Sequence, residues 1–100
     1  MNIIDFDIEQ GSTFNDNITL NEDLTGYTVR CNIEDGNGTV FKGFGTITDE
    51  SNGTINIHID DGITAIFDTG LGYYAIELED TNGTVTKPIK GRLYIEREIV

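Results

Sequence analysis

Residues 72–85, Gly-Tyr-Tyr-Ala-Ile-Glu-Leu-Glu-Asp-Thr-Asn-Gly-Thr-Val, carry the two signals that decide the fold. In the first half Tyr74, Ile76 and Leu78 alternate with outward positions, which is the period of a strand with one buried face. The second half contains Asn-Gly, the strongest short-range hairpin signal, because both residues tolerate the positive φ angles of a type I′ turn. This stretch therefore predicts two antiparallel strands joined by a tight turn.

The same two signals recur along the chain. Asn-Gly is found again at 37–38 and 52–53, and apolar residues alternate with polar ones between the turns. The pattern predicts about seven strands: 3–9, 13–20, 27–34, 39–48, 54–60, 73–80 and 84–97. Residues 61–67 predict one short helical turn, capped by Asp60 or Asp61, which bridges two sheets. The chain is therefore expected to be a single domain, 1–100, with an all-β, immunoglobulin-like antiparallel sandwich fold.

Two strands are predicted to be irregular. Asp16 falls on the apolar face of its strand, which indicates a bulge, a twist or fraying there. Gly43 and Gly45 interrupt residues 39–48, so the pattern leaves open whether Phe41 or Phe44 points inward.

Residues 72–76 resemble the start of the sixth strand of an immunoglobulin domain. In that strand a tyrosine at the sheet corner bonds back to nearby backbone, two residues before a core position. The resemblance implies these roles for Tyr74 and Ile76, although Gly70 stands where an aspartate is usual.

Composition excludes several classes of protein. The chain has 100 residues, of which 37% are hydrophobic, enough for one core, and no apolar run long enough to span a membrane. The first residues do not resemble a signal peptide, and the single Cys31 indicates a reducing compartment or indifference to redox state. A net charge of −12 opposes binding to nucleic acid and to anionic membranes.

Candidate catalytic residues are few. His58 and Cys31 are each the only residue of their kind, and alternation places them on opposite kinds of strand face. A nucleophile needs a base within hydrogen-bonding distance, so no enzyme activity and no catalytic residue are predicted.

Acidic, glycine-rich loops at 35–38, 49–53, 60–62 and 80–83 leave calcium as an alternative interpretation. None completes an EF-hand pattern, and Asp and Asn favour turns by bonding their own backbone. One histidine and one cysteine exclude a zinc site. Turn formation is the preferred interpretation, and no metal or cofactor is predicted.

Charged residues form two stripes near the ends of the chain. Asp5, Asp7 and Glu9 share the outer face of the first strand, and Lys90, Arg92 and Tyr94 share that of the last. The simpler interpretation is that the two strands lie together and their charges pair within one chain. The functional alternative is an interaction edge formed by these six residues, in which the stripes of neighbouring copies meet.

Taken end to end, the chain resembles the N-terminal domain of upper baseplate proteins of tailed bacteriophages and related β-sandwich modules of tail and head-fibre proteins. No single motif is diagnostic, and the order and spacing of the motifs carry the resemblance. The motifs are Gly-Ser-Thr-Phe at 11–14, Ile-Thr-Leu at 18–20, Leu-Thr-Gly-Tyr-Thr-Val-Arg at 24–30, Asn-Gly-Thr-Ile at 52–55, Thr-Ala at 64–65, Gly-Tyr-Tyr within 72–80, Gly-Thr-Val-Thr at 83–86 and the Gly-x-Leu strand at 91–95.

The resemblance implies a virion structural protein, made in the bacterial host cytoplasm, that docks in the tail or baseplate by protein–protein contacts. Its partners would be other virion proteins, in multiple symmetric copies. A capsid decoration protein or head-fibre anchor is the first alternative. A carbohydrate-binding sandwich is more distant, because it needs exposed aromatic residues and only Tyr73 and Tyr94 point outward by alternation.

Overall fold

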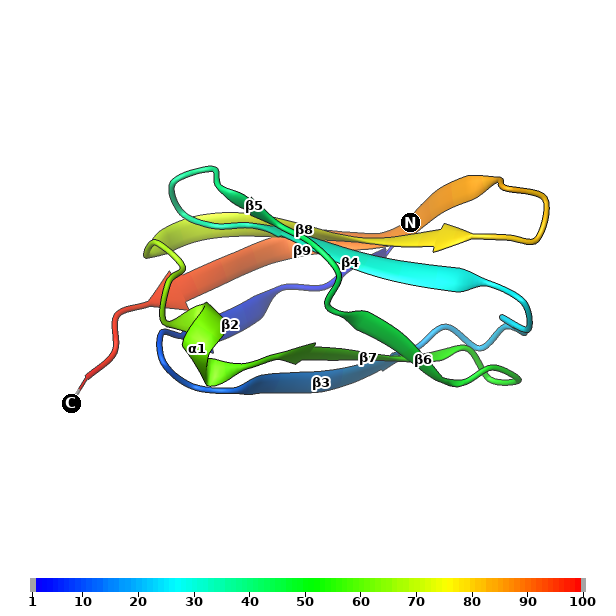
Figure 1. Cartoon of the computed structure of the whole chain (residues 1–100), viewed down its shortest axis with the longest axis horizontal. Helices are drawn as coiled ribbons and strands as arrows, with labels where there is room; N and C mark the ends of the chain where they lie inside the picture. Colours follow the sequence, from blue (N-terminus) through cyan, green and yellow to red (C-terminus); the bar gives the residue numbers. More distant parts are fainter. Residues whose placement is uncertain (1, 100) are drawn as a thin grey trace.

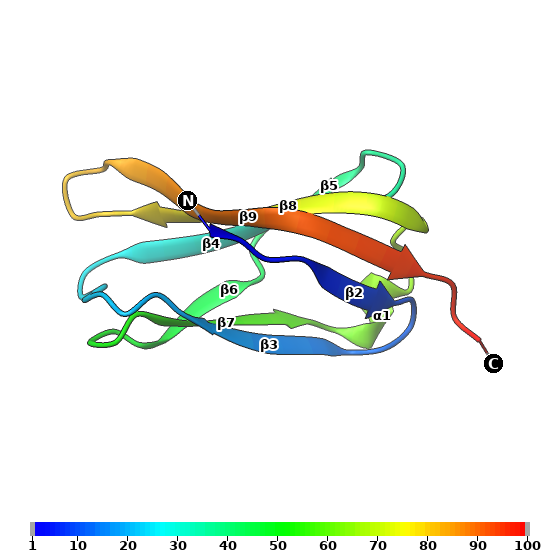
Figure 2. The ribbon, with the colours of Figure 1, turned by 180° about the vertical axis from the view of Figure 1, so that it is seen from behind.

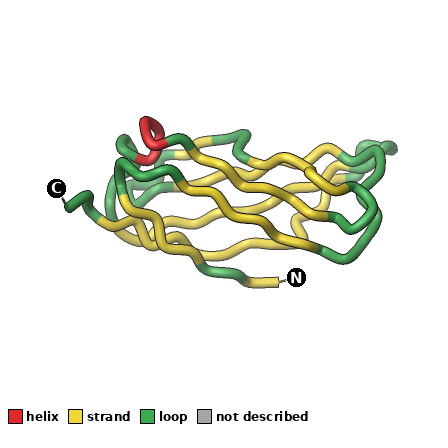
Figure 3. Tube along the Cα trace, turned by 90° about the horizontal axis from the view of Figure 1, so that it is seen from below, coloured by secondary structure: helices red, strands yellow, loops and turns green. Residues whose placement is uncertain are grey.

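The computed structural model describes residues 2–99, which form two β-sheets packed face to face (Figure 1). The strands run along the long axis of a body that measures 44 × 21 × 20 Å (Figure 3). The larger sheet contains β1 (Asn2–Ile3), β2 (Phe6–Glu9), β4 (Thr28–Glu34), β5 (Val40–Phe41), β8 (Gly70–Glu79) and β9 (Val85–Glu96). The smaller sheet contains β3 (Phe14–Thr19), β6 (Gly45–Asp49) and β7 (Thr54–Ile59).

The order of the strands is that of an immunoglobulin domain. The smaller sheet has the order β3-β7-β6, and the larger has β9-β8-β4-β5, which match B-E-D and G-F-C-C′ of that fold. The predicted all-β sandwich is therefore confirmed. One detail differs, because β1 and β2 both pair with β9 in parallel rather than antiparallel (Figure 2).

The core lies between the sheets and is built mainly from inward-facing strand residues, as the alternation predicts. Leu24, in the loop before β4, and Phe67, after the helical turn, close it at the ends. The buried apolar residues on strands are Ile8, Ile18, Cys31, Ile33, Ile55, Ile57, Ile59, Tyr74, Ile76, Leu78, Ile89, Leu93 and Ile95.

The strand predicted at 39–48 is in fact two strands in different sheets. β5 belongs to the larger sheet and β6 to the smaller, and the chain crosses between them at Gly43, whose φ is +92°. Only glycine adopts this backbone conformation without strain. The crossing also resolves the question of the two phenylalanines, because Phe41 and Phe44 both pack against the core.

The strand predicted at 3–9 is also interrupted, between β1 and β2. There the side chain of Asp5, rather than a backbone carbonyl, accepts the main-chain N–H of Arg92, at 3.0 Å. The side chain of Asp5 therefore takes the place of one backbone hydrogen-bond acceptor in the sheet, and β1 and β2 lie on either side of it.

The sequence predicted a bulge, a twist or fraying at Asp16, and the structure shows no bulge there. The β3·β7 ladder runs without a register shift from Phe14 opposite Ile59 to Thr19 opposite Thr54. Asp16 is exposed because β3 is an edge strand of the smaller sheet, where the sandwich is open to solvent.

The hairpin turns differ from the predicted type I′. In each Asn-Gly pair only the glycine has a positive φ, as at Gly38 and Gly83. The N–H of Gly83 donates to the oxygen of Asp80, and Asp80 in turn donates to Thr84. This is a three-residue loop, in which a left-handed glycine follows an ordinary turn.

The short helix α1 (Asp61–Thr64) joins β7 of the smaller sheet to β8 of the larger, which confirms the predicted bridge. Asp60 occupies the N-cap position, but its side chain makes no capping bond. It bonds instead to Nε2 of His58, at 2.9 Å. Thr64, in the helix, connects it to the loop before β3, because its hydroxyl donates to the main-chain oxygen of Ser12 at 2.7 Å.

Candidate interaction surface

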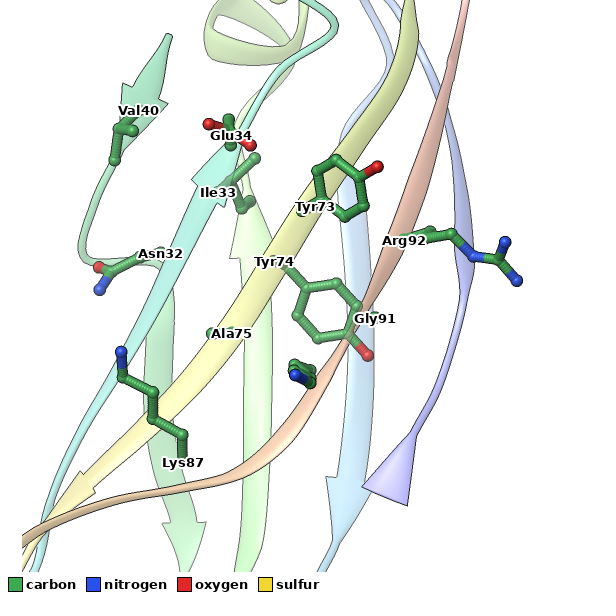
Figure 4. Close-up of a pocket in the computed structure, with 11 residues that line it drawn as sticks. Asn32, Ile33, Glu34, Val40, Tyr73, Tyr74, Ala75, Lys87, Gly91 and Arg92 are labelled. Carbon is green, nitrogen blue, oxygen red and sulfur yellow. The ribbon is translucent and has the colours of Figure 1, made fainter. Parts of the chain in front are cut away.

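The outer face of the larger sheet is the surface that points away from the core on β2, β9, β8 and β4. A groove of about 700 Å³ lies across it, with Ala75 at its base (Figure 4). Val40 and Tyr73 give it apolar walls, and their exposed fractions are 54% and 49%. Exposed apolar side chains gathered beside a hollow are typical of a contact surface.

The groove is basic although the protein is strongly acidic. Three basic residues line it, Lys87, Lys90 and Arg92, against one acidic residue, Glu34. The whole chain, in contrast, has a net charge of −12. The groove therefore favours an occupant that brings negative charge.

A ridge lies on the same face beside the groove. It consists of Leu71 and Tyr94, which are opposite each other on β8 and β9 and are 44% and 40% exposed. The guanidinium of Arg92 lies 6.0 Å from the centre of the Tyr94 ring, within reach of a cation–π contact. Groove and ridge are thus adjacent parts of one face.

The two predicted stripes of charge lie side by side in one chain. The parallel pairing places Asp7 opposite Tyr94 and Glu9 opposite Glu96, while Asp5 lies against Arg92. Oδ2 of Asp5 is 3.2 Å from a guanidinium nitrogen of Arg92. The backbone and side-chain hydrogen bonds from Arg92 hold the pKa of Asp5 below its usual value. Asp5 and Arg92 therefore pair within one chain, as the simpler of the two interpretations expects.

Asp7 and Lys90, by contrast, have no ion-pair partner among residues 2–99. Both side chains are exposed on the outer face of the larger sheet. Other charges of this face pair across strands, since Arg30 lies 3.1 Å from Glu77 and 3.3 Å from Glu79.

The last strand, a candidate for the interaction edge, is an open backbone edge only at its start. From Ile89 onward β9 is paired on both sides, with β8 and with β1 and β2. The free backbone edges of the larger sheet are therefore β5, the interrupted first strand, and the starts of β4 and β9, which pair on one side alone. On β9 itself, Lys90, Arg92 and Tyr94 can meet a partner only through their side chains.

The outer face of the smaller sheet has a different character. Asn56 donates to the side-chain oxygens of Asn15 and Asn17, at 2.8 and 2.9 Å. None of the large exposed hydrophobic side chains belongs to β3, β6 or β7. This face satisfies its own hydrogen bonds, so the outer face of the larger sheet is the candidate interaction surface.

Cys31 and His58 lie apart, as the alternation predicts. Cys31 is buried in the core, and desolvation raises the pKa of its thiol to about 12, so the sulfur stays protonated at neutral pH. His58 is half exposed on the smaller sheet, flanked by the buried Ile57 and Ile59. The two side chains form no nucleophile–base pair.

The acidic loops use their carboxylates on the backbone. Oδ1 of Asp35 accepts the N–H groups of Asn37 and Thr39, and Oδ1 of Asp80 does the same for Asn82 and Thr84. Across residues 2–99 no three His, Cys, Asp or Glu side chains are grouped as metal ligands would be. Turn formation accounts for these carboxylates.

Comparison of the chain with protein-family models and with curated proteins finds no match. Within the described part of the chain, no helix is long and apolar enough to cross a membrane.

The groove was not predicted from the sequence, although the sequence contains a signal for it. Alternation marks Tyr73 and Tyr94 as the outward tyrosines, and both lie on the candidate surface. The groove itself needs Val40 and Lys87, which come from strands at opposite sides of the sheet. Only the strand order brings them to the same hollow.

Proposed function

We propose that this protein is a bacteriophage virion structural protein, a docking module of the tail or baseplate that acts through protein–protein contacts. The order and spacing of its motifs support this, because they resemble phage baseplate and fibre modules along nearly the whole chain. The immunoglobulin-like sandwich is compatible with that role, since the fold serves as a rigid carrier of surfaces.

The observation that carries the proposal is the contrast between the two outer faces. The larger sheet presents exposed Tyr73, Leu71 and Tyr94 beside a groove, whereas the smaller sheet presents polar residues bonded to one another. Aromatic residues are enriched where proteins meet. In a virion, symmetry repeats each contact, so that individually weak contacts add up through avidity.

Location within the particle distinguishes the main proposal from its alternative. A tail or baseplate module would be found at the tail, and a capsid decoration protein or head-fibre anchor on the head. The first experiment is mass spectrometry of density-purified particles of the phage that encodes the chain, followed by immunogold labelling. We expect the protein in the particles and the gold at the tail. Gold on the head would support the alternative, and absence from purified particles would overturn both.

A matched pair of variants connects this test to the surface. Tyr73→Asp places a charge at the exposed apolar wall of the groove, and His58→Asp places one on the smaller sheet. Both positions are exposed, so both variants should fold. We expect Tyr73→Asp to be lost from particles and His58→Asp to be incorporated. Equal incorporation would remove the outer face of the larger sheet as the docking surface.

Carbohydrate binding is a second candidate, favoured by one observation. Tyr73 lines the groove together with Asn32, whose buried Oδ1 is without a hydrogen-bond partner among the described residues. An aromatic ring and unsatisfied polar groups in a cleft are features of sugar sites. Titration calorimetry with cell-wall oligosaccharides tests it. Saturable heat that disappears in Tyr73→Ala would support it, and no heat at millimolar ligand would contradict it.

A further inference from the structure

We infer that a second copy of this chain covers the outer face of the larger sheet, in a two-fold dimer in which the ridge of each copy fills the groove of the other. The inference rests on the proposed function in that both assign this face to protein contacts, and it specifies the partner. Two properties of the face support it, shape and charge, and its area indicates a weak contact.

On β8 the shape of the face is self-complementary about the row formed by Tyr73 and Arg92. Two positions away in one direction lie the bulky Leu71 and Tyr94, and two positions away in the other lie Ala75 and Lys90. Consider a two-fold axis that runs along this row, across the strands and between the two facing sheets. It reverses the direction of the strands in the second copy and keeps their side-by-side order. On β8 it places Leu71 of one copy over Ala75 of the other, so a large side chain meets a small one, and on β9 it places Tyr94 over Lys90.

The same operation pairs the unpartnered charges. Asp7 lies opposite Tyr94 in the sheet, so the axis carries it to the neighbourhood of Lys90 of the second copy. Within one chain the two cannot meet, because Tyr94 and Lys90 are four residues apart on β9, about 13 Å along a strand. Asp7 and Lys90 thus have no ion-pair partner among residues 2–99, and a second copy brings them together twice.

The area of the overlap is that of a weak contact. Around the proposed axis the overlapping strands are the first strand, β9 and β8, because β4 ends at Glu34, opposite Tyr73. Three strands spaced about 4.8 Å apart span about 14 Å, and β8 begins three residues before Tyr73, so the overlap extends about 24 Å along the strands. The product is about 340 Å² on each copy, and symmetry in a particle can reinforce such a contact. Two copies of net charge −12 repel at long range, and salt at about 0.15 M screens this repulsion while close ion pairs persist.

Sedimentation of the whole chain at about 0.15 M salt tests the inference through charge exchange. We expect the wild-type chain of 11.0 kDa to sediment as a dimer. Asp7→Lys and Lys90→Asp should each weaken dimerisation about tenfold or more, since each places like charges together. The double variant should restore it. Because the two sites are too far apart to pair within one chain, restoration can arise only between copies.

The control is Lys42→Asp, which reverses a charge at an exposed position outside this face. It should leave the dimer unchanged, and circular dichroism should show that every variant is folded. A wild-type chain that stays monomeric at about 1 mM would overturn the dimer without affecting incorporation into particles. Dimerisation that survives both single reversals, or that the double variant fails to restore, would overturn this geometry.

Discussion

The hydroxyl of Tyr74 donates a hydrogen bond to the main-chain oxygen of Ile4, 70 positions earlier in the chain, at 2.5 Å. The immunoglobulin resemblance predicted a bond from this tyrosine to nearby backbone, and the structure corrects it to the first strand. The acceptor lies at the break between β1 and β2, beside Asp5. Burial raises the pKa of Tyr74, so its hydroxyl remains a donor at neutral pH. Tyr74 thereby fixes the first strand to the sheet.

Replacing Tyr74 by Phe should loosen the first strand. The variant keeps the ring and leaves the Ile4 carbonyl without this donor, which costs about 1–3 kcal/mol. We expect a lower denaturation midpoint and faster amide exchange in residues 4–9. Tyr73→Phe, at an exposed neighbouring position, is the control and should change neither. Unchanged exchange in Tyr74→Phe would show that the first strand is held without this bond.

Gly91→Ala should be more damaging than most substitutions of glycine. A Cβ at position 91 would lie 1.9 Å from the oxygen of Ile4, which is backbone and cannot rotate away. Overpacking of this kind costs about 3 kcal/mol. Gly62→Ala is the control, because a Cβ there would meet no atom within 4 Å beyond its neighbours and its own helix. Urea denaturation of the two variants measures the difference, and equal stabilities would contradict the close approach of the first strand.

Asp35→Ala should cost more stability than Asp80→Ala, although both residues begin the same hairpin turn. Oδ2 of Asp35 also accepts the N–H of Asp68, so this buried carboxylate connects the β4–β5 hairpin to the segment before β8. Desolvation raises its pKa, but the three N–H donors outweigh that effect and lower it overall. Removing the carboxylate leaves these N–H donors without an acceptor, which lowers the free energy of unfolding by about 2–4 kcal/mol. Thermal melting of both variants tests this, and equal losses would contradict the connecting role.

The contact of Asp5 with Arg92 should make stability depend on pH. Since the folded pKa of Asp5 is lowered from 3.8, its stabilisation is present above pH 3.8 and is lost as pH falls through the folded value. Asp5→Asn keeps the shape without the charge. Its melting temperature should therefore be below that of the wild type at pH 7, and the two melting temperatures should converge at acidic pH. Glu9→Gln, on the same stripe, is the control, and a difference for Asp5→Asn that persists in strong acid would contradict this account.

Alternation in the sequence was sufficient to predict which side of most strands is buried. Ile57 and Ile59 are in the core with His58 outside, and Cys31 is buried between outward polar neighbours. The reason is local, because successive side chains of a strand point to opposite faces whatever the strand pairs with. Strand breaks were harder to predict, since Gly43 signals an irregularity but not that the chain changes sheets there.

By itself, then, the sequence determined a single acidic β-sandwich, its buried faces and the positions of its turns, because strand period and turn chemistry act between residues close in the chain. The tertiary structure decided the parallel pairing of the first strand with β9, the bond from Tyr74 to Ile4 and the groove shared by Val40 and Lys87. These depend on which strands become neighbours. Strand order follows from packing two sheets together, a property of the whole chain that no local pattern contains.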